Sequence, residues 1–187
     1  MKIQIFNGGN PDHFPSKRDE DFGFDLYSAV AGDDIEVILP LETKRIPTAV
    51  RSVLPEGVCG YIVERSSTGM KSMSIRAGVM DSGYRGYWNV QITNVGFRPL
   101  VITNNLNTKT IVDAVKARLK EAVANEGYPQ FLVSDTSEVI IHEASKALAQ
   151  FMILQECKKV ELEEVDEQTI INTPSERGEG KEGSSGK

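Results

Sequence analysis

A chain of 187 residues with 40 % hydrophobic and 26 % charged residues can bury one sizeable core, which predicts a single domain with an appendage. Its net charge of −6 argues against broad binding of nucleic acid, which needs a basic surface. No apolar run approaches the roughly 20 residues of a membrane span, and the alternating start of the chain does not resemble a signal peptide. We therefore expect a cytoplasmic protein that binds neither nucleic acid nor membrane.

The first half of the chain has the pattern of an all-β protein. From Lys2 to about Asn94, short runs rich in Val, Ile, Tyr and Thr alternate with turn residues such as Ser82-Gly83. We predict strands at 2–6, 35–39, 45–50, 60–64 and 87–93. Many short strands at close spacing favour a β-sandwich, a jelly roll or a distorted barrel.

One amphipathic helix is predicted after Asn94. Apolar residues at positions 111, 112, 115, 119, 122 and 123 fall on one face of a 3.6-residue period. With Thr108 as the N-cap and Gly127 followed by Pro129 as the stop signal, the helix covers about 109–126. Further strands are predicted at 131–134, 139–142, 149–154 and 160–165.

From about Ile170 the chain is rich in Gly, Ser and Glu, a composition typical of disorder. A Gly/Ser stretch with an Arg is also typical of a flexible phosphate clamp, because glycine backbone approaches an anion closely. Both interpretations stay open at this point. Cys59 and Cys157 are too few for a disulfide framework and are expected to be buried, and His13 and His142 are assigned no chemistry.

The most informative segment is Ala77–Gly86. In it, an apolar strand is followed by Asp81 and a turn that contains Gly83, and Tyr84 and Arg85 come at the end of that turn. Upstream, Arg65 is followed by two serines, and a planar guanidinium beside two hydroxyls suits phosphate oxygens. Hydrolysis of a phosphoanhydride needs a positioned water, a base and positive charge on the phosphoryl oxygens.

Five motifs in this chain resemble, in content and order, those of the trimeric dUTPase family. They are Phe22–Ala29, Arg65–Ser67, Ala77–Gly86, Leu148–Gln150 and Arg177–Gly186. The resemblance covers about 1–94 and 144–187. It implies a distorted jelly roll or β-barrel, a homotrimer with active sites between subunits, and hydrolysis of dUTP to dUMP and pyrophosphate.

The resemblance also implies a role for individual residues. Asp81 falls on the water-activating base, Tyr84 on the residue that packs against deoxyribose, and Gly78 on the hairpin whose backbone reads uracil. Asp25 falls on the carboxylate that reaches Mg²⁺ through water, with the metal held weakly and mainly by the substrate's phosphates. The remaining substrate-binding residues are Arg65, Ser66, Ser67, Gln150, Arg177, Ser184 and Ser185.

The chain departs from the family pattern in four places. Glu64 stands where the family usually has Pro, Ser145-Lys146-Ala147 replaces Gly-Asp-Arg, and Glu182 occupies the position of a Phe that stacks on uracil. An extra segment at 95–143 resembles the one in some bacteriophage dUTPases, which would place the protein in the cytoplasm of a bacterial host. The predicted organisation is a β core at 1–94 and 144–169, the insert at 95–143, and a flexible C-terminal arm at 170–187.

Two alternatives come from other classes of function. The related dCTP deaminases carry a catalytic Glu ten positions after the motif Asp, where this chain has Gln91, and a carboxamide cannot transfer the protons of deamination. A dUTPase-like phage protein could instead act mainly as a regulatory module, with the helix of the insert engaging a protein partner.

Overall fold

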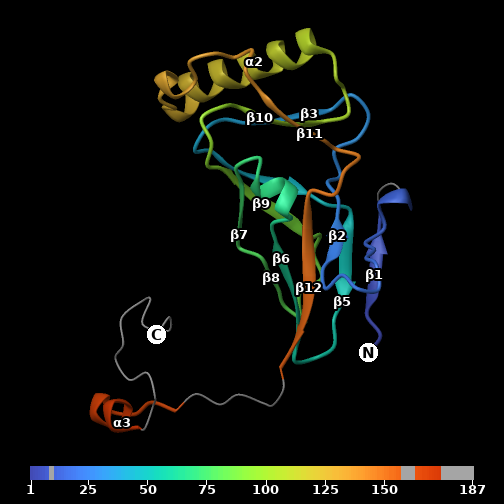
Figure 1. Ribbon diagram of the computed structural model, residues 1–187, viewed down its shortest axis with the longest axis vertical. Coiled ribbons are helices and arrows are strands. Elements are labelled where there is room, and N and C mark those ends of the chain that lie inside the picture. Colours follow the sequence, from blue (N-terminus) through green and yellow to red (C-terminus); the bar gives the residue numbers. More distant parts are fainter. Residues whose placement is uncertain (9–10, 157–162, 174–187) are drawn as a thin grey trace. The chain divides into compact units, whose positions relative to one another are not determined.

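The computed structural model describes residues 1–8, 11–156 and 163–173 (Figure 1). The chain divides into two compact units, Met1–Gln155 and Glu156–Lys187. In the second unit, the described residues form the short helix α3 (Glu167–Asn172), which begins where the Asp166 carboxylate accepts a hydrogen bond from the Thr169 amide at 2.7 Å. All the strands described below belong to the first unit.

The strands of the first unit form four small sheets among the described residues, and the all-β prediction is confirmed. The two-stranded sheet pairs β1 (Gln4–Asn7) with β5 (Val50–Val53). The four-stranded sheet has the order β2 (Phe24–Leu26), β12 (Ala149–Gln155), β6 (Val58–Val63), β8 (Val79–Met80). The three-stranded sheets have the orders β4 (Thr43–Pro47), β9 (Asn89–Asn94), β7 (Met73–Arg76) and β11 (Ile140–Glu143), β10 (Leu100–Thr103), β3 (Ile35–Ile38).

Three of the predicted strands differ from the structure. The strand expected at 45–50 is broken, because the chain leaves β4 after Pro47 and Thr48 turns to donate its amide and hydroxyl to the Trp88 carbonyl. The strand expected at 131–134 is wrong: the 3-10 helix η2 (Gln130–Leu132) occupies that place. Residues 163–165 of the strand expected at 160–165 are not in a strand, and the other three lie outside the described residues.

The main core lies between the four-stranded sheet and its neighbours. Trp88 is fully buried, and its ring meets Phe151 edge-on with centroids 4.9 Å apart. Gly60 lets that indole approach β6, since a Cβ at this position would come within 2.8 Å of the ring. Cys59, on the same strand, is half-buried rather than buried as predicted, and Cys157 lies outside the described residues.

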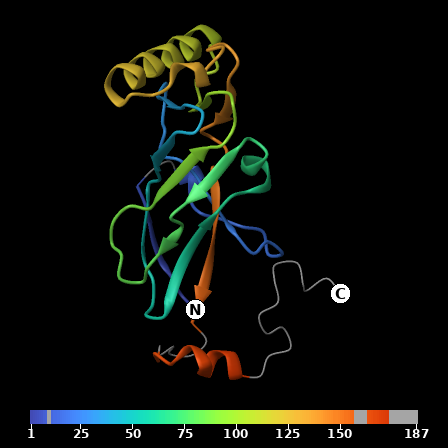
Figure 2. The ribbon, with the colours of Figure 1, turned by 90° about the vertical axis from the view of Figure 1, so that its left-hand side faces the viewer.

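Helix α2 (Thr108–Glu126) corresponds to the predicted helix and lies across the sheet of β3, β10 and β11 (Figures 1 and 2). It connects β10 to β11, which run parallel and therefore need a crossover. Asn107, not Thr108, is the N-cap: its side chain accepts a hydrogen bond from the Thr110 amide at 3.0 Å. Gly127 ends the helix in the left-handed conformation at φ 68°.

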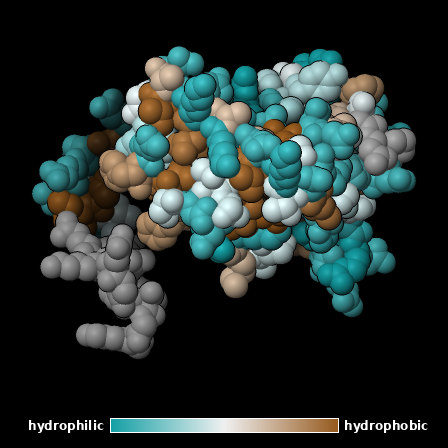
Figure 3. Space-filling model, turned by 90° about the horizontal axis from the view of Figure 1, so that it is seen from above, coloured by the Kyte–Doolittle hydropathy of each residue, from teal (hydrophilic) through white to brown (hydrophobic). Residues whose placement is uncertain are grey.

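The apolar face of α2 is covered by the chain itself. Ile111, Val115, Leu119 and Ala122 pack in a second core with residues of β3 and β10 such as Val37. Viewed from the α2 side, the surface of the molecule mixes hydrophilic residues with smaller apolar groups (Figure 3). The helix therefore buries its apolar stripe on its own sheet, which leaves a polar face with Lys116 and Lys120 toward solvent.

Two other short elements complete the fold. The 3-10 helix η1 (Pro11–His13) follows β1, and His13 stacks on Tyr27 with ring centroids 4.6 Å apart. Helix α1 (Ser66–Gly69) follows β6, and the buried Thr68 hydroxyl both accepts from the Arg65 amide and donates to the Arg65 carbonyl. Within the described ranges, no helix is long and apolar enough to cross a membrane.

Candidate active site

Five of the predicted site residues line one pocket of about 760 Å³, called here the Arg65 pocket: Asp25, Arg65, Ser66, Ser67 and Gln150. They come from three segments that are distant in the sequence: β2, the end of β6 with the start of α1, and β12. Gln150 of β12 lies opposite Asp25 of β2 on one side and Val63 of β6 on the other. The chain thus assembles the residues of its first, second and fourth motifs by strand pairing.

Direct contacts orient the polar groups of the Arg65 pocket. The Arg65 guanidinium donates from Nε to Oδ1 of Asp25 at 2.9 Å. The Gln150 side chain donates from Nε2 to the Glu64 carbonyl at 2.9 Å, and Gly23 makes room for it, because a Cβ there would lie 2.7 Å from Oε1 of Gln150. The hydroxyl-bearing residues Ser66 and Ser67 are exposed at the start of α1.

Sequence reasoning missed two further cations in the Arg65 pocket, Lys17 and Arg18. Lys17 donates from Nζ to the Asp21 carbonyl at 2.8 Å, and Arg18 pairs through Nε with the Asp21 carboxylate at 2.8 Å. That contact lowers the pKa of Asp21. The adjacent Lys and Arg just upstream of the first motif were the sequence signal that could have identified these two cations. With Arg65, these residues offer three cations against two carboxylates.

Glu64, one of the residues that depart from the family pattern, has a structural role. Its carboxylate accepts a hydrogen bond from the Ile75 amide of β7 at 2.6 Å. A proline would offer no acceptor at this position. Glu64 therefore links the segment that carries Arg65 to the hairpin that leads into the third motif.

That hairpin runs from β7 through Ala77 and Gly78 into β8. Ala77 has a φ of 49°, an uncommon conformation for a residue with a Cβ. At Gly78 a Cβ would lie 2.3 Å from the Ile62 carbonyl oxygen, and the Gly78 carbonyl accepts from the Ile62 amide at 2.8 Å. Only glycine permits this approach of the two backbones.

The turn after β8 presents Asp81 to solvent. Its carbonyl accepts a hydrogen bond from the Tyr84 amide at 3.0 Å, and the Arg85 guanidinium caps the turn by donating to the carbonyls of Ser82 and Tyr84. The Tyr84 hydroxyl donates to the Tyr87 carbonyl at 3.1 Å and passes over Gly86, where a Cβ would collide with it at 2.3 Å. Tyr84 lines a separate pocket of about 510 Å³ with Arg45, Thr48 and Tyr87, among others.

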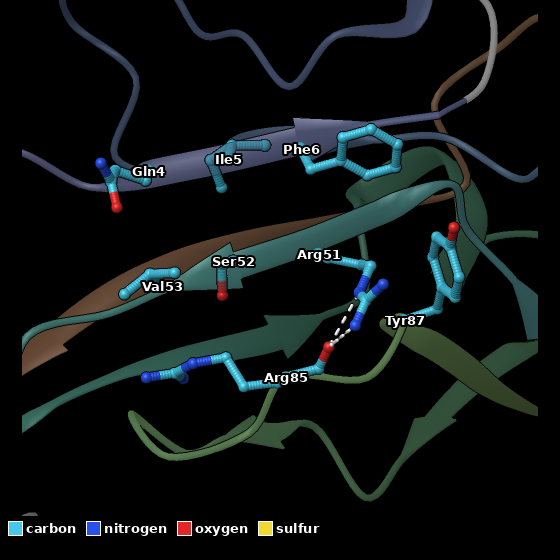
Figure 4. A pocket seen from close by; sticks show the side chains of 8 residues that line it. All are labelled: Gln4, Ile5, Phe6, Arg51, Ser52, Val53, Arg85 and Tyr87. Atoms are coloured by element: carbon cyan, nitrogen blue, oxygen red, sulfur yellow. Dashed lines mark hydrogen bonds between the residues drawn. The ribbon is translucent and has the colours of Figure 1, made fainter.

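A third pocket of about 400 Å³ lies beside the end of this turn (Figure 4). Arg51 of β5 points across it and donates from both Nε and Nη2 to the Arg85 carbonyl, while its guanidinium carbon lies 5.0 Å from the centre of the Tyr87 ring. These two hydrogen bonds from the Arg51 guanidinium fix the segment after Tyr84 to the edge of the β1–β5 sheet. The pocket holds none of the residues predicted from the sequence to bind substrate or catalyse hydrolysis.

The chain thus brings only some of its predicted site residues together in one pocket. Asp25, Arg65, Ser66, Ser67 and Gln150 form one group, whereas Gly78, Asp81 and Tyr84 lie outside the Arg65 pocket. Arg177, Ser184 and Ser185 lie outside the described residues. In the described part of the chain, no group of three or more His, Cys, Asp or Glu side chains is arranged to hold a metal ion.

Comparison with known proteins places these observations in a family. The family model for dUTPase matches residues 10–107, more than half of the chain. The deoxyuridine 5'-triphosphate nucleotidohydrolase of Escherichia phage T5 is 34% identical over 110 residues, which cover 56% of this chain and 72% of the phage enzyme. The enzyme of Mesorhizobium japonicum is 33% identical over 96 residues.

The chain spans only part of several relatives. The match covers 60% of the Mesorhizobium enzyme and 8% of the Pol polyprotein of equine infectious anemia virus, to which the chain is 37% identical over 97 residues.

Solved structures share the fold. The dUTPase of Staphylococcus bacteriophage 80alpha in complex with dUPNHPP superposes with a TM-score of 0.62 at 23% identity and covers 100% of this chain and 99% of that one. The dUTPase of phage phi11 of S. aureus, whose structure visualises a species-specific insert, gives a TM-score of 0.57 at 22% identity over 89% of this chain and 97% of that one. The predicted jelly roll of the dUTPase type is confirmed. With a family model across more than half of its length and a phage enzyme covered over 72% of its own, this chain belongs to the dUTPase family.

Proposed function

We propose that this protein hydrolyses dUTP to dUMP and pyrophosphate, a reaction that limits uracil incorporation into DNA and supplies dUMP. The observation that carries the proposal is the Arg65 pocket, whose lining includes Lys17, Arg18, Arg65 and two exposed serines beside Gln150. Three cations and several neutral donors suit a triphosphate, whose transfer chemistry depends on positioning and electrostatic stabilisation. Membership in the dUTPase family supports the same substrate.

The third motif supplies the rest of the chemistry in this proposal. Asp81, exposed in its turn, is the general base that takes a proton from the attacking water. The ring of Tyr84 packs against deoxyribose and leaves no room for a 2′-hydroxyl. The backbone around Gly78 reads uracil, and the close contact of Gly78 with Ile62 holds that backbone in place.

We further propose that the active enzyme is a homotrimer. Asp81 and Tyr84 lie outside the Arg65 pocket of their own chain, so a complete site needs the third motif of one subunit beside the phosphate-binding residues of another. The arm residues Arg177, Ser184 and Ser185 would close the site from a further subunit.

Magnesium fits the Arg65 pocket as a partner of the substrate. A structure of the phage phi11 dUTPase describes the coordination of a structural Mg(II) ion. In this chain Asp25 is paired with Arg65 at 2.9 Å, which suits a contact to Mg²⁺ through water better than direct ligation. The ion would neutralise charge on the phosphates, which hold most of its coordination sphere.

Two further assignments belong to the same proposal. A protein partner at the 95–143 insert would contact the polar outer face of α2, since the apolar face is buried in the chain. The enzyme would act in the cytoplasm, that of a bacterial host cell if it is encoded by a phage.

The deciding experiment measures pyrophosphate and ammonia release from dUTP, dCTP and UTP with Mg²⁺ present. We expect pyrophosphate from dUTP far in excess of that from UTP, with dUMP as the second product and no ammonia from dCTP. Ammonia from dCTP would overturn the proposal in favour of a deaminase. Binding of a non-hydrolysable dUTP analogue without any turnover of dUTP would overturn it in favour of a regulatory module.

A further inference from the structure

A second pocket of about 480 Å³ adjoins the Arg65 pocket and is called here the Lys146 pocket. The two share Asp25, Arg65 and Ser67, which form a common wall. The far side of the Lys146 pocket is made of residues to which the proposed function gives no role, among them Lys71, Ser145 and Lys146, the last two at positions where this chain departs from the family pattern. Arg65 thus faces two cavities, only one of which the proposed catalytic arrangement uses.

Three segments distant in sequence are fixed to one another around this pocket. Lys71, just after α1, donates from Nζ to the Ile141 carbonyl of β11 at 2.8 Å. Arg65 donates from Nη1 to the Ala147 carbonyl at 3.4 Å. The turn between β11 and β12 is held from its other side, where the Ser145 amide donates to Oδ1 of Asn104 at 2.9 Å. These hydrogen bonds hold the backbone segments that carry Arg65, Lys71 and Lys146 around one pocket.

The Lys146 pocket concentrates positive charge in a chain whose net charge is −6. Asp25 is the carboxylate among its lining residues, and it is paired with Arg65. Lys146 pairs with Glu143 at 2.5 Å, whereas Lys71 has no carboxylate within salt-bridge distance among the described residues. Burial and then the charge of Lys146 lower the pKa of Lys71, as expected when like charges are held close together.

The chemistry of the lining favours an inorganic anion over a nucleoside. The hydroxyls of Ser67, Ser145 and Tyr27 add neutral donors to the three cations. One face of the Tyr27 ring is already covered by His13, at a centroid distance of 4.6 Å. His142, 3 % exposed, closes the pocket as a neutral group at pH 7, because burial and nearby cations lower its pKa to about 4.

We propose that the Lys146 pocket binds a multiply charged phosphate anion, and that its ligand is the pyrophosphate released in the adjoining Arg65 pocket. The identity of the source rests on the proposed function, whereas the binding of the anion does not. Because Arg65 and Ser67 line both pockets, pyrophosphate can exchange contacts along this wall without first leaving for solvent. Retention there makes pyrophosphate an inhibitor of the enzyme.

Calorimetric titration of the full chain with sodium pyrophosphate, in EDTA and without nucleotide, tests the site directly. The double variant Lys71→Ala, Lys146→Ala should weaken binding by about tenfold or more, since each removes a charge-assisted contact. Lys146→Glu, a change at an exposed residue, should weaken it comparably and covers the case in which Lys71→Ala impairs folding. The matched comparison is Lys17→Ala, Arg18→Ala, which removes two cations from the Arg65 pocket alone: it should weaken only binding in that pocket and leave the affinity of the Lys146-dependent binding step within about threefold.

Several outcomes would overturn the site. These are the absence of saturable binding, an affinity loss that follows Lys17 and Arg18 instead of Lys71 and Lys146, or equally tight binding of sulfate. The assay of dUTP turnover separates this inference from the proposed function. If pyrophosphate binding depends on Lys146 but the protein does not hydrolyse dUTP, the anion site stands and dUTP hydrolysis is not the source of its ligand. If the protein hydrolyses dUTP but shows no such binding, the anion site alone is overturned.

Discussion

Asp81 sits in a turn whose geometry depends on its backbone and on Arg85, not on its carboxylate. The Asp81 carbonyl accepts from the Tyr84 amide, and the Arg85 guanidinium caps the carbonyls of Ser82 and Tyr84. A change confined to the carboxylate therefore tests chemistry without rebuilding the turn.

Asp81→Asn should lower kcat for dUTP by about 10²-fold or more, the typical contribution of a general base. The carboxamide keeps the size of the side chain but cannot take the proton, so the affinity for a non-hydrolysable dUTP analogue should change little. Steady-state kinetics and calorimetry measure the two effects. A kcat equal to that of the unmodified protein would remove Asp81 from its role.

Gly78 and Gly69 form a matched pair for testing the backbone requirement of the hairpin between β7 and β8, which we propose reads uracil. Gly78→Ala places a methyl group 2.3 Å from the Ile62 carbonyl oxygen, whereas no atom lies within 4 Å of a Cβ built at Gly69. We expect Gly78→Ala to lower the free energy of unfolding by about 1–3 kcal/mol, the usual cost of overpacking. Gly69→Ala, in the short helix α1, should be neutral or slightly stabilising. Urea denaturation compares them, and equal stabilities would contradict the prediction.

At the scale of elements, Arg118 anchors α2 to the turn between β3 and β4. Its guanidinium donates to Glu42 at 2.5 Å and to Glu126 at 2.7 Å, and the side chains of Arg118 and Glu42 are 15% and 14% exposed. The Glu42 carboxylate also accepts from the Leu39 amide at 2.7 Å. These contacts raise the pKa of Arg118.

Arg118→Met should cost about 2–4 kcal/mol of unfolding free energy, because it leaves the largely buried Glu42 carboxylate without its cation. Lys120→Met on the exposed face of α2 is the control and should cost less than about 0.5 kcal/mol. Chemical denaturation measures both. A loss at Arg118 as small as that at Lys120 would show that the apolar contacts of the helix suffice to hold it.

His142 on β11 makes the stability of the fold dependent on pH. Burial, followed by the charge of Lys71, lowers its pKa from 6.5 to about 4; Arg65 and Lys146 act in the same direction, and the Lys146 carbonyl acts in the opposite one. Between pH 6.5 and 4 the unfolded chain therefore binds a proton that the folded chain does not. The stability that His142 contributes is complete above pH 6.5 and declines as the pH falls toward 4.

His142→Gln should flatten the pH dependence of the unfolding free energy between pH 6.5 and 4, by at most about 3 kcal/mol across this window. The slope is the informative quantity, since the substitution also changes packing. Denaturation at several pH values measures it. An unchanged slope in the variant would assign the acid sensitivity to other groups.

At the scale of the whole molecule, the separation of Asp81 from the Arg65 pocket makes a prediction about assembly. If one subunit supplies Asp81 and another supplies Arg65, then Arg65→Ala and Asp81→Asn, each nearly inactive alone, should complement each other. Random trimers from equal amounts of the two should recover about a quarter of the unmodified activity, because each site then receives both intact residues by chance. Light scattering should report a trimer, and a mixture no more active than either variant would place the site within one chain.

Local sequence patterns predicted the elements of this fold whose conformation depends mainly on residues close by in the sequence. The period of 3.6 over nineteen residues and the left-handed Gly127 suffice to predict α2, because a helix satisfies its own backbone. The N-cap was off by one residue, since Asn107 and Thr108 both carry a suitable side-chain oxygen. The run at 131–134 gave the wrong element, because a short apolar run does not distinguish a strand from a 3-10 turn.

The sequence by itself determined the family, the five motifs and the residue types that the chemistry needs. Residue spacing within a turn or at a strand end can be read from the sequence without knowing the rest of the fold. The tertiary structure decided which of these residues meet. Pairing of β12 with β2 and β6 joins Asp25, Arg65 and Gln150 across 125 positions of sequence, and it leaves Asp81 elsewhere. The tertiary structure also places the Ile75 amide within hydrogen-bond distance of the Glu64 carboxylate and Lys71 near Lys146. Strand pairing is a long-range choice driven by burial and backbone hydrogen bonding, so no local pattern records it.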